Sequence, residues 1–209
     1  MTKVLAGDCE VRSERVDALL PDDAAFASEY DRLPAWRRGR CDAFRFPADK
    51  RRSVAAWALL RLVLAEKGEA ADDWKVVENE SGKPAFAHRP DVHFNLSHAG
   101  ERVMAVVASA PVGCDVERVA TLRDGVAEAC LTSGELIRLA AEPEGPSRDR
   151  AFCAMWVRKE SYVKACGSGL SMELKSFSVL PGEEPSGAVF EDFDFGDGHL
   201  GCVCRFRRD

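Results

Sequence analysis

Residues 156–170 read WVRKESYVKACGSGL, which predicts a helix followed by a flexible loop. Trp156, Glu160 and Lys164 are spaced four residues apart, so an indole, a carboxylate and an ammonium share one stripe of this helix. The Gly-Ser-Gly of residues 167–169 then ends the helix. Such a stripe is either ordinary charge pairing on an amphipathic helix or part of a functional site, and this stretch alone does not distinguish the two.

The same plan occurs earlier in the chain. A shift of 99 residues places Trp57 on Trp156 and Gly68 on Gly167. Each half then runs from a long helix through a glycine to a short strand, a glycine-containing turn and two strands. Identity between the halves is low, so an internal duplication is a hypothesis. It predicts an α+β protein of two similar α/β halves, residues 1–108 and 109–209, with the active site between them.

Hydrophobic periodicity and the glycine and proline positions give a coarse element map. Helices are predicted at 22–33, 49–67, 126–130, 134–141 and from 156 onwards. Strands are predicted at 3–7, 9–11, 74–78, 92–96, 102–109, 111–119, 176–180, 187–195 and 199–207.

The composition is that of a globular chain. Its 209 residues are 46% hydrophobic, without an apolar run as long as a membrane span or the apolar core of a signal peptide near the first residues. We therefore expect a cytoplasmic protein that uses no membrane. The eight cysteines are scattered without a CxxC, which favours reduced, buried thiols over disulfides or zinc ligands.

Charge is unevenly distributed. The net charge is −6, yet residues 32–61 carry nine Arg or Lys residues against only two acidic ones. A local basic patch on an acidic protein suggests a compact polyanion and argues against nucleic acid, which favours broader basic surfaces. The alternative, that these residues merely keep a helix soluble, remains open at this point.

Two carboxylates stand out in PVGCDVERV, residues 111–119. On a strand, Asp115 and Glu117 point to the same face, opposite the apolar residues with which they alternate. They are either the solvated face of an edge strand or ligands for a hard cation such as Mg²⁺. A metal site needs a third ligand, for which Glu160 is the candidate.

Ser97 and His98 occur in HFNLSHAG, residues 93–100, where a strand meets a turn. Both residues suit turns, and the chain has no GxSxG nucleophile elbow, so a hydrolase triad is not indicated. Lys83, in the SGKP turn of residues 81–84, means little by itself.

In this order, FNLSH, GCDVE and WVRKESYVKACGSGL resemble the marks of the 4′-phosphopantetheinyl transferases of the surfactin-synthetase-activating type. The resemblance spans residues 94–170, and the basic helix and GKP turn extend it upstream to about residue 37. It implies a pseudo-twofold fold and transfer of phosphopantetheine from coenzyme A to a serine of an apo acyl, peptidyl or aryl carrier protein. Adenosine 3′,5′-bisphosphate would be released, with Mg²⁺ (or Mn²⁺) as the cofactor. A duplicated chain could supply both halves of the site, so we expect a monomer.

The resemblance also implies roles for matching positions. Asp115, Glu117 and Glu160 would hold the metal against the diphosphate of coenzyme A. Lys164 would lie near the reacting phosphate, and Glu160 or a metal-activated water would be the catalytic base. Residues expected to contact the nucleotide and its phosphates are Arg37, Arg40, Arg52, Ser53, Lys83, Ser97 and His98. Ala99, Ala56 and Trp57 depart from the residues commonest in the family, which affects only details of the nucleotide pocket.

Two other functions use the same residues. A metal-dependent phosphohydrolase would activate water instead of a serine, and a binding module would have kept the fold without catalysis. For the transferase, an acidic carrier would dock on a local patch with apolar contacts, which we place within residues 120–139, around Leu131 and Ile137. Trp156 is expected in the core or against the pantetheine arm.

Overall fold

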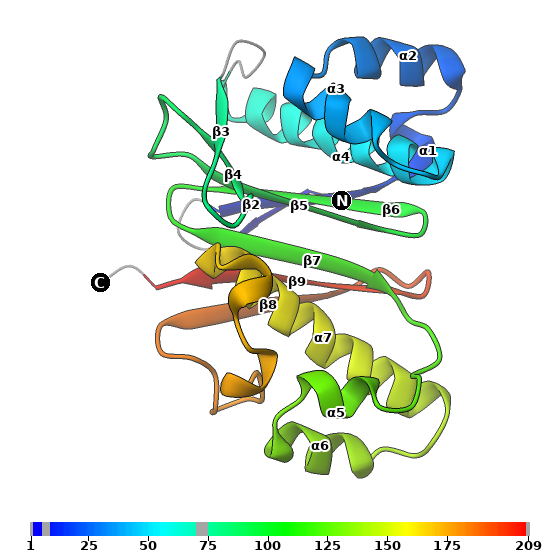
Figure 1. Cartoon of the computed structure of the whole chain (residues 1–209), viewed down its shortest axis with the longest axis vertical. Coiled ribbons are helices and arrows are strands. Elements are labelled where there is room, and N and C mark those ends of the chain that lie inside the picture. Colours follow the sequence, from blue (N-terminus) through cyan, green and yellow to red (C-terminus); the bar gives the residue numbers. More distant parts are fainter. Residues whose placement is uncertain (1, 6–8, 70–74, 208–209) are drawn as a thin grey trace.

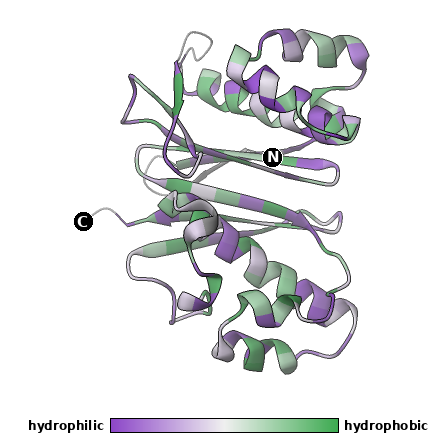
Figure 2. Cartoon of the chain, in the orientation of Figure 1, coloured by the Kyte–Doolittle hydropathy of each residue, from purple (hydrophilic) through white to green (hydrophobic). Residues whose placement is uncertain are grey.

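The computed structural model describes residues 2–5, 9–69 and 75–207. Two sheets form the middle of the molecule, and helices cover the outer face of each, which gives four layers (Figure 1). In Figure 2 the helices of both outer layers carry hydrophilic as well as hydrophobic residues, as expected where one side packs on a sheet and the other meets solvent.

The first half supplies a four-stranded antiparallel sheet in the order β1-β2-β6-β5. Its strands are β1 (Thr2–Leu5), β2 (Cys9–Arg15), β5 (His93–Ala99) and β6 (Arg102–Ala108). A separate short hairpin pairs β3 (Val76–Glu78) with β4 (Pro84–Phe86). The covering helices are α1 (Val16–Leu19), α2 (Asp23–Asp31), α3 (Ala35–Asp42) and α4 (Pro47–Glu66).

After Arg102, strand β6 is an unbroken apolar run because both of its faces are covered. Val103, Ala105 and Val107 pack in the cluster beneath α4, whereas Met104 and Val106 pack in the cluster shared with the second sheet. A strand buried on both sides is expected to be a continuous apolar run rather than an alternating one. This strand therefore joins the two cores of the protein.

The second half supplies a three-stranded antiparallel sheet in the order β7-β9-β8. Its strands are β7 (Val112–Arg118), β8 (Ala188–Asp194) and β9 (His199–Phe206). Its helices are α5 (Val126–Cys130), α6 (Ser133–Ala140) and α7 (Pro146–Cys166), followed by the 3-10 turns η1 (Gly169–Ser171) and η2 (Leu174–Ser176).

Helix α7 lies unusually close to β7, and Gly113 makes this approach possible. A Cβ at Gly113 would lie 2.1 Å from the carbonyl oxygen of Ser161 and 2.4 Å from the amide nitrogen of Ala165. Only a residue without a side chain fits there. The close packing places the face of β7 that carries Asp115 and Glu117 directly under the helix that carries Glu160.

The two sheets meet along the edges of β5 and β7, and side chains join them. Asn95 Oδ1 accepts a hydrogen bond from the Cys114 amide at 2.9 Å, and Ser97 Oγ accepts one from the Val116 amide at 3.2 Å. Two side chains of β5 thereby satisfy main-chain donors of β7 that would otherwise be orphaned in a buried place.

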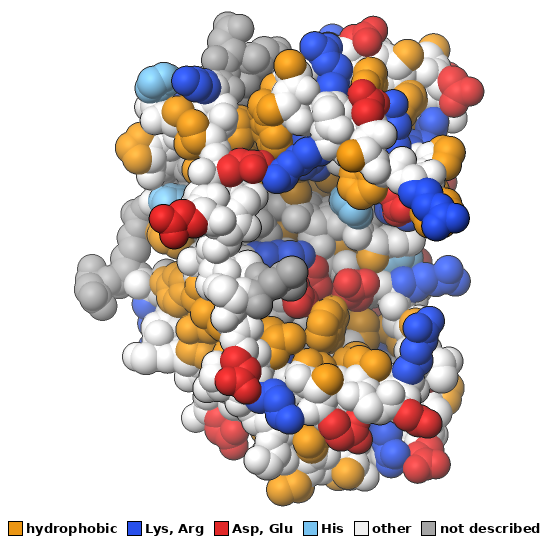
Figure 3. All heavy atoms as spheres, viewed as in Figure 1, with side chains coloured by type: hydrophobic (Ala, Val, Ile, Leu, Met, Phe, Trp, Pro, Cys, Tyr) orange, Lys and Arg blue, Asp and Glu red, His pale blue; other side chains and the backbone are white. Residues whose placement is uncertain are grey.

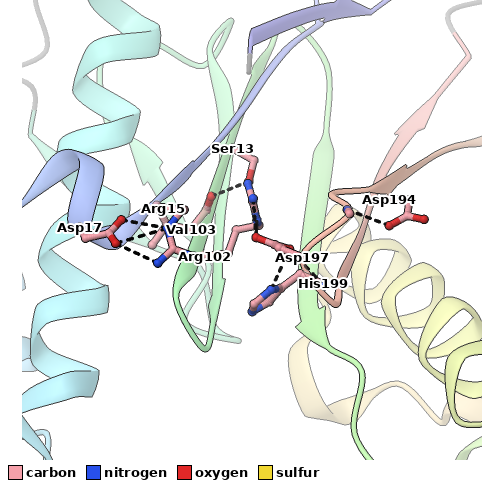
Figure 4. Close-up of polar contacts among 9 residues, drawn as sticks. Ser13, Arg15, Asp17, Arg102, Val103, Asp194, Asp197 and His199 are labelled. Atoms are coloured by element: carbon pink, nitrogen blue, oxygen red, sulfur yellow. Dashed lines mark hydrogen bonds and ion pairs between the residues drawn. The ribbon is translucent and has the colours of Figure 1, made fainter. Parts of the chain in front are cut away.

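A second connection ties the turns at the far end of the sheets (Figure 4). Arg102 donates to Asp197 at 2.6 Å and to Ser13 Oγ at 3.2 Å, and Asp197 lies 3.0 Å from His199 Nδ1. Next to this network, a Cβ at Gly100 would lie 2.7 Å from His199 Nε2. Residues of β2, β6 and β9 are thus fixed relative to one another.

The mixed helix-and-sheet class predicted from the sequence is confirmed. Both halves contain a long helix, a left-handed glycine after it (Gly68 at φ 76°, Gly167 at φ 70°) and a later two-stranded hairpin, β5–β6 or β8–β9. The pseudo-twofold axis and the division at residue 108 stay predictions. The sheets differ, with four strands in one and three in the other.

Some element predictions need correction. The strand predicted at 176–180 is wrong, because η2 ends at Ser176 and residues 177–180 form bends and irregular backbone. The predicted strands at 3–7 and 74–78 lie partly outside the described residues. Across the described ranges no helix is long and apolar enough to span a membrane, and all eight cysteines are free thiols, seven of them buried.

Candidate functional site

A cavity of about 540 Å³ lies between the two halves. Figure 3 shows this face hollowed where the halves meet, with basic, acidic and histidine side chains gathered in the hollow. Nine of the eleven side chains predicted at the site line the cavity: Arg37, Arg40, Ser53, Ser97, His98, Asp115, Glu117, Glu160 and Lys164. They come from α3, α4, β5, β7 and α7, so both halves build one site.

Asp115 is the buried centre of the carboxylate wall. Its side chain is almost inaccessible, and Oδ1 accepts hydrogen bonds from Lys164 Nζ at 2.6 Å and from Ser97 Oγ at 2.8 Å. Oδ2 is also buried but has no hydrogen-bond partner among the described residues. A buried, unpartnered carboxylate oxygen is costly, so this atom is suited to a ligand that supplies positive charge or a donor.

The other two carboxylates are destabilised in their charged form. Burial, followed by the charge of Asp115, raises the pKa of Glu117 to about 7, although Lys164 and a hydrogen bond from Trp156 oppose the shift. Burial also raises the pKa of Glu160, which Asp115 increases further. A cation bound in the cavity would stabilise the ionised form of both carboxylates and lower their pKa values.

The three acidic side chains do not form a closed metal site in this conformation. Within residues 2–5, 9–69 and 75–207, no three His, Cys, Asp or Glu side chains converge closely enough to hold an ion. Instead the Lys164 ammonium lies against Asp115. The donor set of oxygen ligands nevertheless suits Mg²⁺ or Mn²⁺, and the free Oδ2 of Asp115 faces no competing partner in the described structure.

The opposite end of the cavity is basic. The Arg37 guanidinium packs against the rings of Trp36 and Trp57, 6.0 and 5.8 Å from their centroids, and donates to Ser53 Oγ at 2.9 Å. Its Nε is buried without a partner, and in the described part of the chain no carboxylate forms an ion pair with it. Burial lowers the pKa of the Arg37 guanidinium. A desolvated, unpaired guanidinium is a strong candidate for binding an anion.

His98 is a neutral partner in this basic end. Burial, and then the charges of Arg37 and Arg52, lower the pKa of His98 to about 4. Arg40 is more exposed and is paired with Glu78 at 2.9 Å. A phosphate bound near these groups would favour protonation of His98 and strengthen the hydrogen bonds it can donate.

Two predicted residues lie outside the cavity lining. Arg52 forms an ion pair with Asp49 and donates to the Gly100 carbonyl at 3.3 Å. Lys83 directs its ammonium to main-chain carbonyls at the end of α7 and the start of β7. Their nucleotide-binding roles therefore stay predictions, although the charge of Arg52 does act on His98 in the cavity.

Sequence reasoning missed several contributors. Phe44, Pro84, Asn95 and Leu96 also line the cavity, and none of them carries a charge that would have drawn attention. Trp156 lines it as well, so it is not confined to the core. The edge-bridging role of Asn95 depends on a strand that is distant in sequence.

A fully buried ion pair behind the site was also missed. Lys159 and Glu135 lie 2.8 Å apart, and neither side chain is exposed. Lys159 donates to the carbonyls of Leu174 and Phe177, while Glu135 accepts from the Val179 amide. The carbonyl of Phe177 and the amide of Val179 lie in the segment predicted to be a strand, residues 176–180, and these bonds satisfy them without a neighbouring strand. Thr132 and Glu135 fit a capping box, a signal that could have placed Glu135 at a helix start.

Comparison with known proteins is consistent with this arrangement. Residues 111–205 match the family model described as 4′-phosphopantetheinyl transferase superfamily. Residues 19–112 match the model described as 4′-phosphopantetheinyl transferase, N-terminal. The two matches together span most of the chain and meet close to the start of β7.

Individual relatives carry the same description. The chain is 30% identical over 197 residues to the 4′-phosphopantetheinyl transferase ffp of Bacillus subtilis, covering 87% of each protein. It is 33% identical over 170 residues to the 4′-phosphopantetheinyl transferase Sfp of Bacillus subtilis strain 168, covering 81% of this chain and 74% of that protein. It is 34% identical over 132 residues to the 4′-phosphopantetheinyl transferase AcpT of Salmonella typhi, covering 61% of this chain and 66% of that protein.

Proposed function

The chain belongs to the 4′-phosphopantetheinyl transferase superfamily and is a transferase; on this premise we propose that it moves phosphopantetheine from coenzyme A to a serine of an apo carrier protein. The acceptor would be an acyl, peptidyl or aryl carrier, and the second product adenosine 3′,5′-bisphosphate. Both ends of the cavity come from one chain, which supports an active monomer.

One observation carries the proposal: a single cavity has a basic end and a carboxylate end. Arg37, buried and without an ion pair to any described carboxylate, and His98 lie at one end, and Asp115, Glu117 and Glu160 lie at the other. Coenzyme A carries a diphosphate and a separate 3′-phosphate. The basic end could bind the 3′-phosphate directly. The carboxylate end would repel the diphosphate unless a cation lay between the carboxylates and the phosphates.

Asp115, Glu117 and Glu160 would therefore hold Mg²⁺, with Mn²⁺ as the alternative of similar ligand preference. When bound, the ion would neutralise charge on the diphosphate. Lys164 adds a positive charge beside Asp115, where it would stabilise the leaving bridging oxygen. Catalysis would then depend mainly on positioning and electrostatics.

The transfer itself breaks the serine O–H bond and the bridging P–O bond of coenzyme A and forms one new O–P bond. Glu160 would accept the serine proton, since its carboxylate lines the same cavity as Asp115 and Lys164. The bridging electron pair leaves with adenosine 3′,5′-bisphosphate. No covalent enzyme intermediate is needed.

The test is the intact mass of a panel of apo carrier proteins incubated with the protein, coenzyme A and Mg²⁺. We expect a gain of one phosphopantetheine that is absent with the Glu160→Gln variant. A gain that survives in the variant would keep the transfer and overturn the role of Glu160. Consumption of coenzyme A with free phosphopantetheine and unmodified carriers would instead indicate a phosphohydrolase. Binding of coenzyme A without any turnover would indicate a binding module.

A further inference from the structure

A turn of the first half holds the end of helix α7 in the second half. The last carbonyls of an α-helix have no donor within the helix. In α7, Lys83 Nζ donates to the carbonyl of Lys164 at 2.5 Å and to that of Ala165 at 3.2 Å. It also donates to the Val112 carbonyl at the start of β7, at 3.0 Å. One ammonium thus binds three carbonyls on two elements.

The same turn continues the contact beyond the helix. Asn79 Nδ2 donates to the Gly167 carbonyl at 2.9 Å, and Ser81 Oγ donates to the Ser168 carbonyl at 3.0 Å. Asn79 Oδ1 also accepts from the amides of Ser81 and Lys83, which fixes the shape of the turn. We call residues 79–83 the α7 clip.

The clip contacts Lys164, whose ammonium lies against Asp115 in the cavity. Lys83 binds the main-chain carbonyl of Lys164, while the side chain of Lys164 reaches Asp115 at 2.6 Å. Glu160 lies one helical turn before Lys164. Helix ends fray when their carbonyls are unpaired, so fixing this carbonyl fixes the direction in which Lys164 and Glu160 enter the cavity.

We infer that Lys83 is a positioning residue that sets Lys164 and Glu160 through the end of α7, and that it is not a ligand of coenzyme A. The effect of Lys83 on catalysis rests on the proposed function. The contact between the α7 clip and the end of α7 does not depend on that function. Lys83 is outside the cavity lining, and among the described residues its ammonium donates only to main-chain carbonyls.

Protonation supports the same role. Burial lowers the pKa of Lys83 to about 8, and the titratable groups that face it are the thiols of Cys114, Cys166 and Cys204 together with His93. The ammonium has three N–H donors for three carbonyls, whereas the neutral amine has two. The clip therefore loses a bond as the pH rises through about 8.

The first measurement needs no activity. Hydrogen exchange of peptides covering residues 163–169 is compared between the wild type, Lys83→Met and the control Lys75→Met, an exposed lysine just before β3. We expect exchange about tenfold faster or more only in Lys83→Met, since the end of α7 opens locally. Unchanged exchange would overturn the inference, even if the protein proved not to be a transferase.

The second measurement separates positioning from binding. For Lys83→Met we expect kcat to fall about 10- to 100-fold, as for groups that orient a catalytic residue, while the Kd for adenosine 3′,5′-bisphosphate changes less than about twofold. The reverse pattern, a weaker Kd with kcat retained, would make Lys83 a nucleotide ligand and overturn the inference. Absence of transfer by the wild type would refute the proposed function and leave the exchange result to decide the clip.

A third variant tests the charge. Lys83→Arg keeps several donors and does not lose its proton below about pH 12. We expect kcat of the wild type to decline as the pH rises through about 8. Lys83→Arg should restore most of kcat and shift this decline to higher pH. A decline at the same pH in both proteins would show that Lys83 does not set it.

Discussion

Lys164 Nζ lies 2.6 Å from Asp115 Oδ1, so the carboxylate wall of the cavity already contains its own cation. Although burial opposes it, the charge and hydrogen bond of Asp115 raise the pKa of Lys164. Only one oxygen of Asp115 is used in this way, and the other is buried without a partner among the described residues. Asp115 can therefore serve the lysine and a second positive group at once.

Replacing Asp115 with Asn keeps the shape and removes the charge. We expect kcat/KM for carrier modification to fall by about 100-fold or more, because the substitution weakens the cation site and leaves Lys164 without its counter-charge. Steady-state kinetics at several Mg²⁺ concentrations measure the loss. Asp31→Asn, at the exposed end of α2, is the control and should leave kcat/KM unchanged. Full activity of Asp115→Asn would show that the charge of Asp115 is not needed for transfer.

His98 predicts a pH-dependent stability. Its folded pKa is about 4 because of burial and the nearby arginines, below the ordinary value of 6.5. The unfolded chain therefore binds a proton that the folded protein resists, and stability falls as the pH drops from about 6.5 to about 4. The loss is at most about 3 kcal/mol, since one pKa unit corresponds to about 1.4 kcal/mol. Urea unfolding between pH 7 and 4 measures it.

The variant His98→Asn should show a flatter profile over the same pH range. Adenosine 3′,5′-bisphosphate should in addition raise the pKa of His98 in the wild type, because a phosphate near the imidazole favours its charged form. Titration of the histidine ring by NMR with and without the nucleotide follows this directly. An unshifted titration would place the phosphate away from His98.

Gly113→Ala should destabilise the protein by about 1–3 kcal/mol or more, because its methyl group would collide with the main chain of α7 at Ser161 and Ala165. Thermal unfolding measures the effect. The matched control is Gly39→Ala in α3, where a Cβ would meet nothing within 4 Å. That substitution should be neutral or stabilising by up to about 1 kcal/mol, as for Gly to Ala inside a helix. Equal melting temperatures would contradict the close approach of β7 and α7.

The proposed carrier-docking patch can now be tested at one residue only. Leu131 is fully buried, so Leu131→Glu would unfold the region, whereas Ile137 on α6 is 74% exposed. We expect Ile137→Glu to raise the KM for the carrier about tenfold without changing the Kd for coenzyme A, since a buried apolar anchor is typically worth 1 kcal/mol or more. Leu62→Glu, on exposed α4 surface in the other half, is the control. An unchanged carrier KM would exclude this docking site.

Local chemistry made part of the site predictable. Alternation along β7 correctly predicted that Asp115 and Glu117 share one face, with Val112, Cys114 and Val116 in the core on the other. The alternative of a solvated face is wrong, because α7 covers it and only 2% of Asp115 is exposed. The helix predicted at residues 49–67 was likewise placed well at its end, which Gly68 marks, whereas α4 begins two residues earlier, at Pro47.

Long-range partners were not predictable in the same way. Nothing near Lys83 in the sequence indicates that its ammonium binds carbonyls more than eighty residues away. The apolar alternation at 176–180 indicated a strand, yet the buried pair of Lys159 and Glu135 bonds the backbone there instead. In both cases a polar side chain from a distant element competed successfully with local preference.

The joint between β5 and β7 has a consequence for any attempt to divide the protein. Asn95 and Ser97 hydrogen-bond the edge strand β7, so the edges of the two sheets cover each other. Separating the two halves would expose both edges to solvent at once. Unprotected strand rims are templates for aggregation. Each fragment expressed alone should therefore precipitate or self-associate, and co-expression of the two should rescue solubility by restoring the mutual cover.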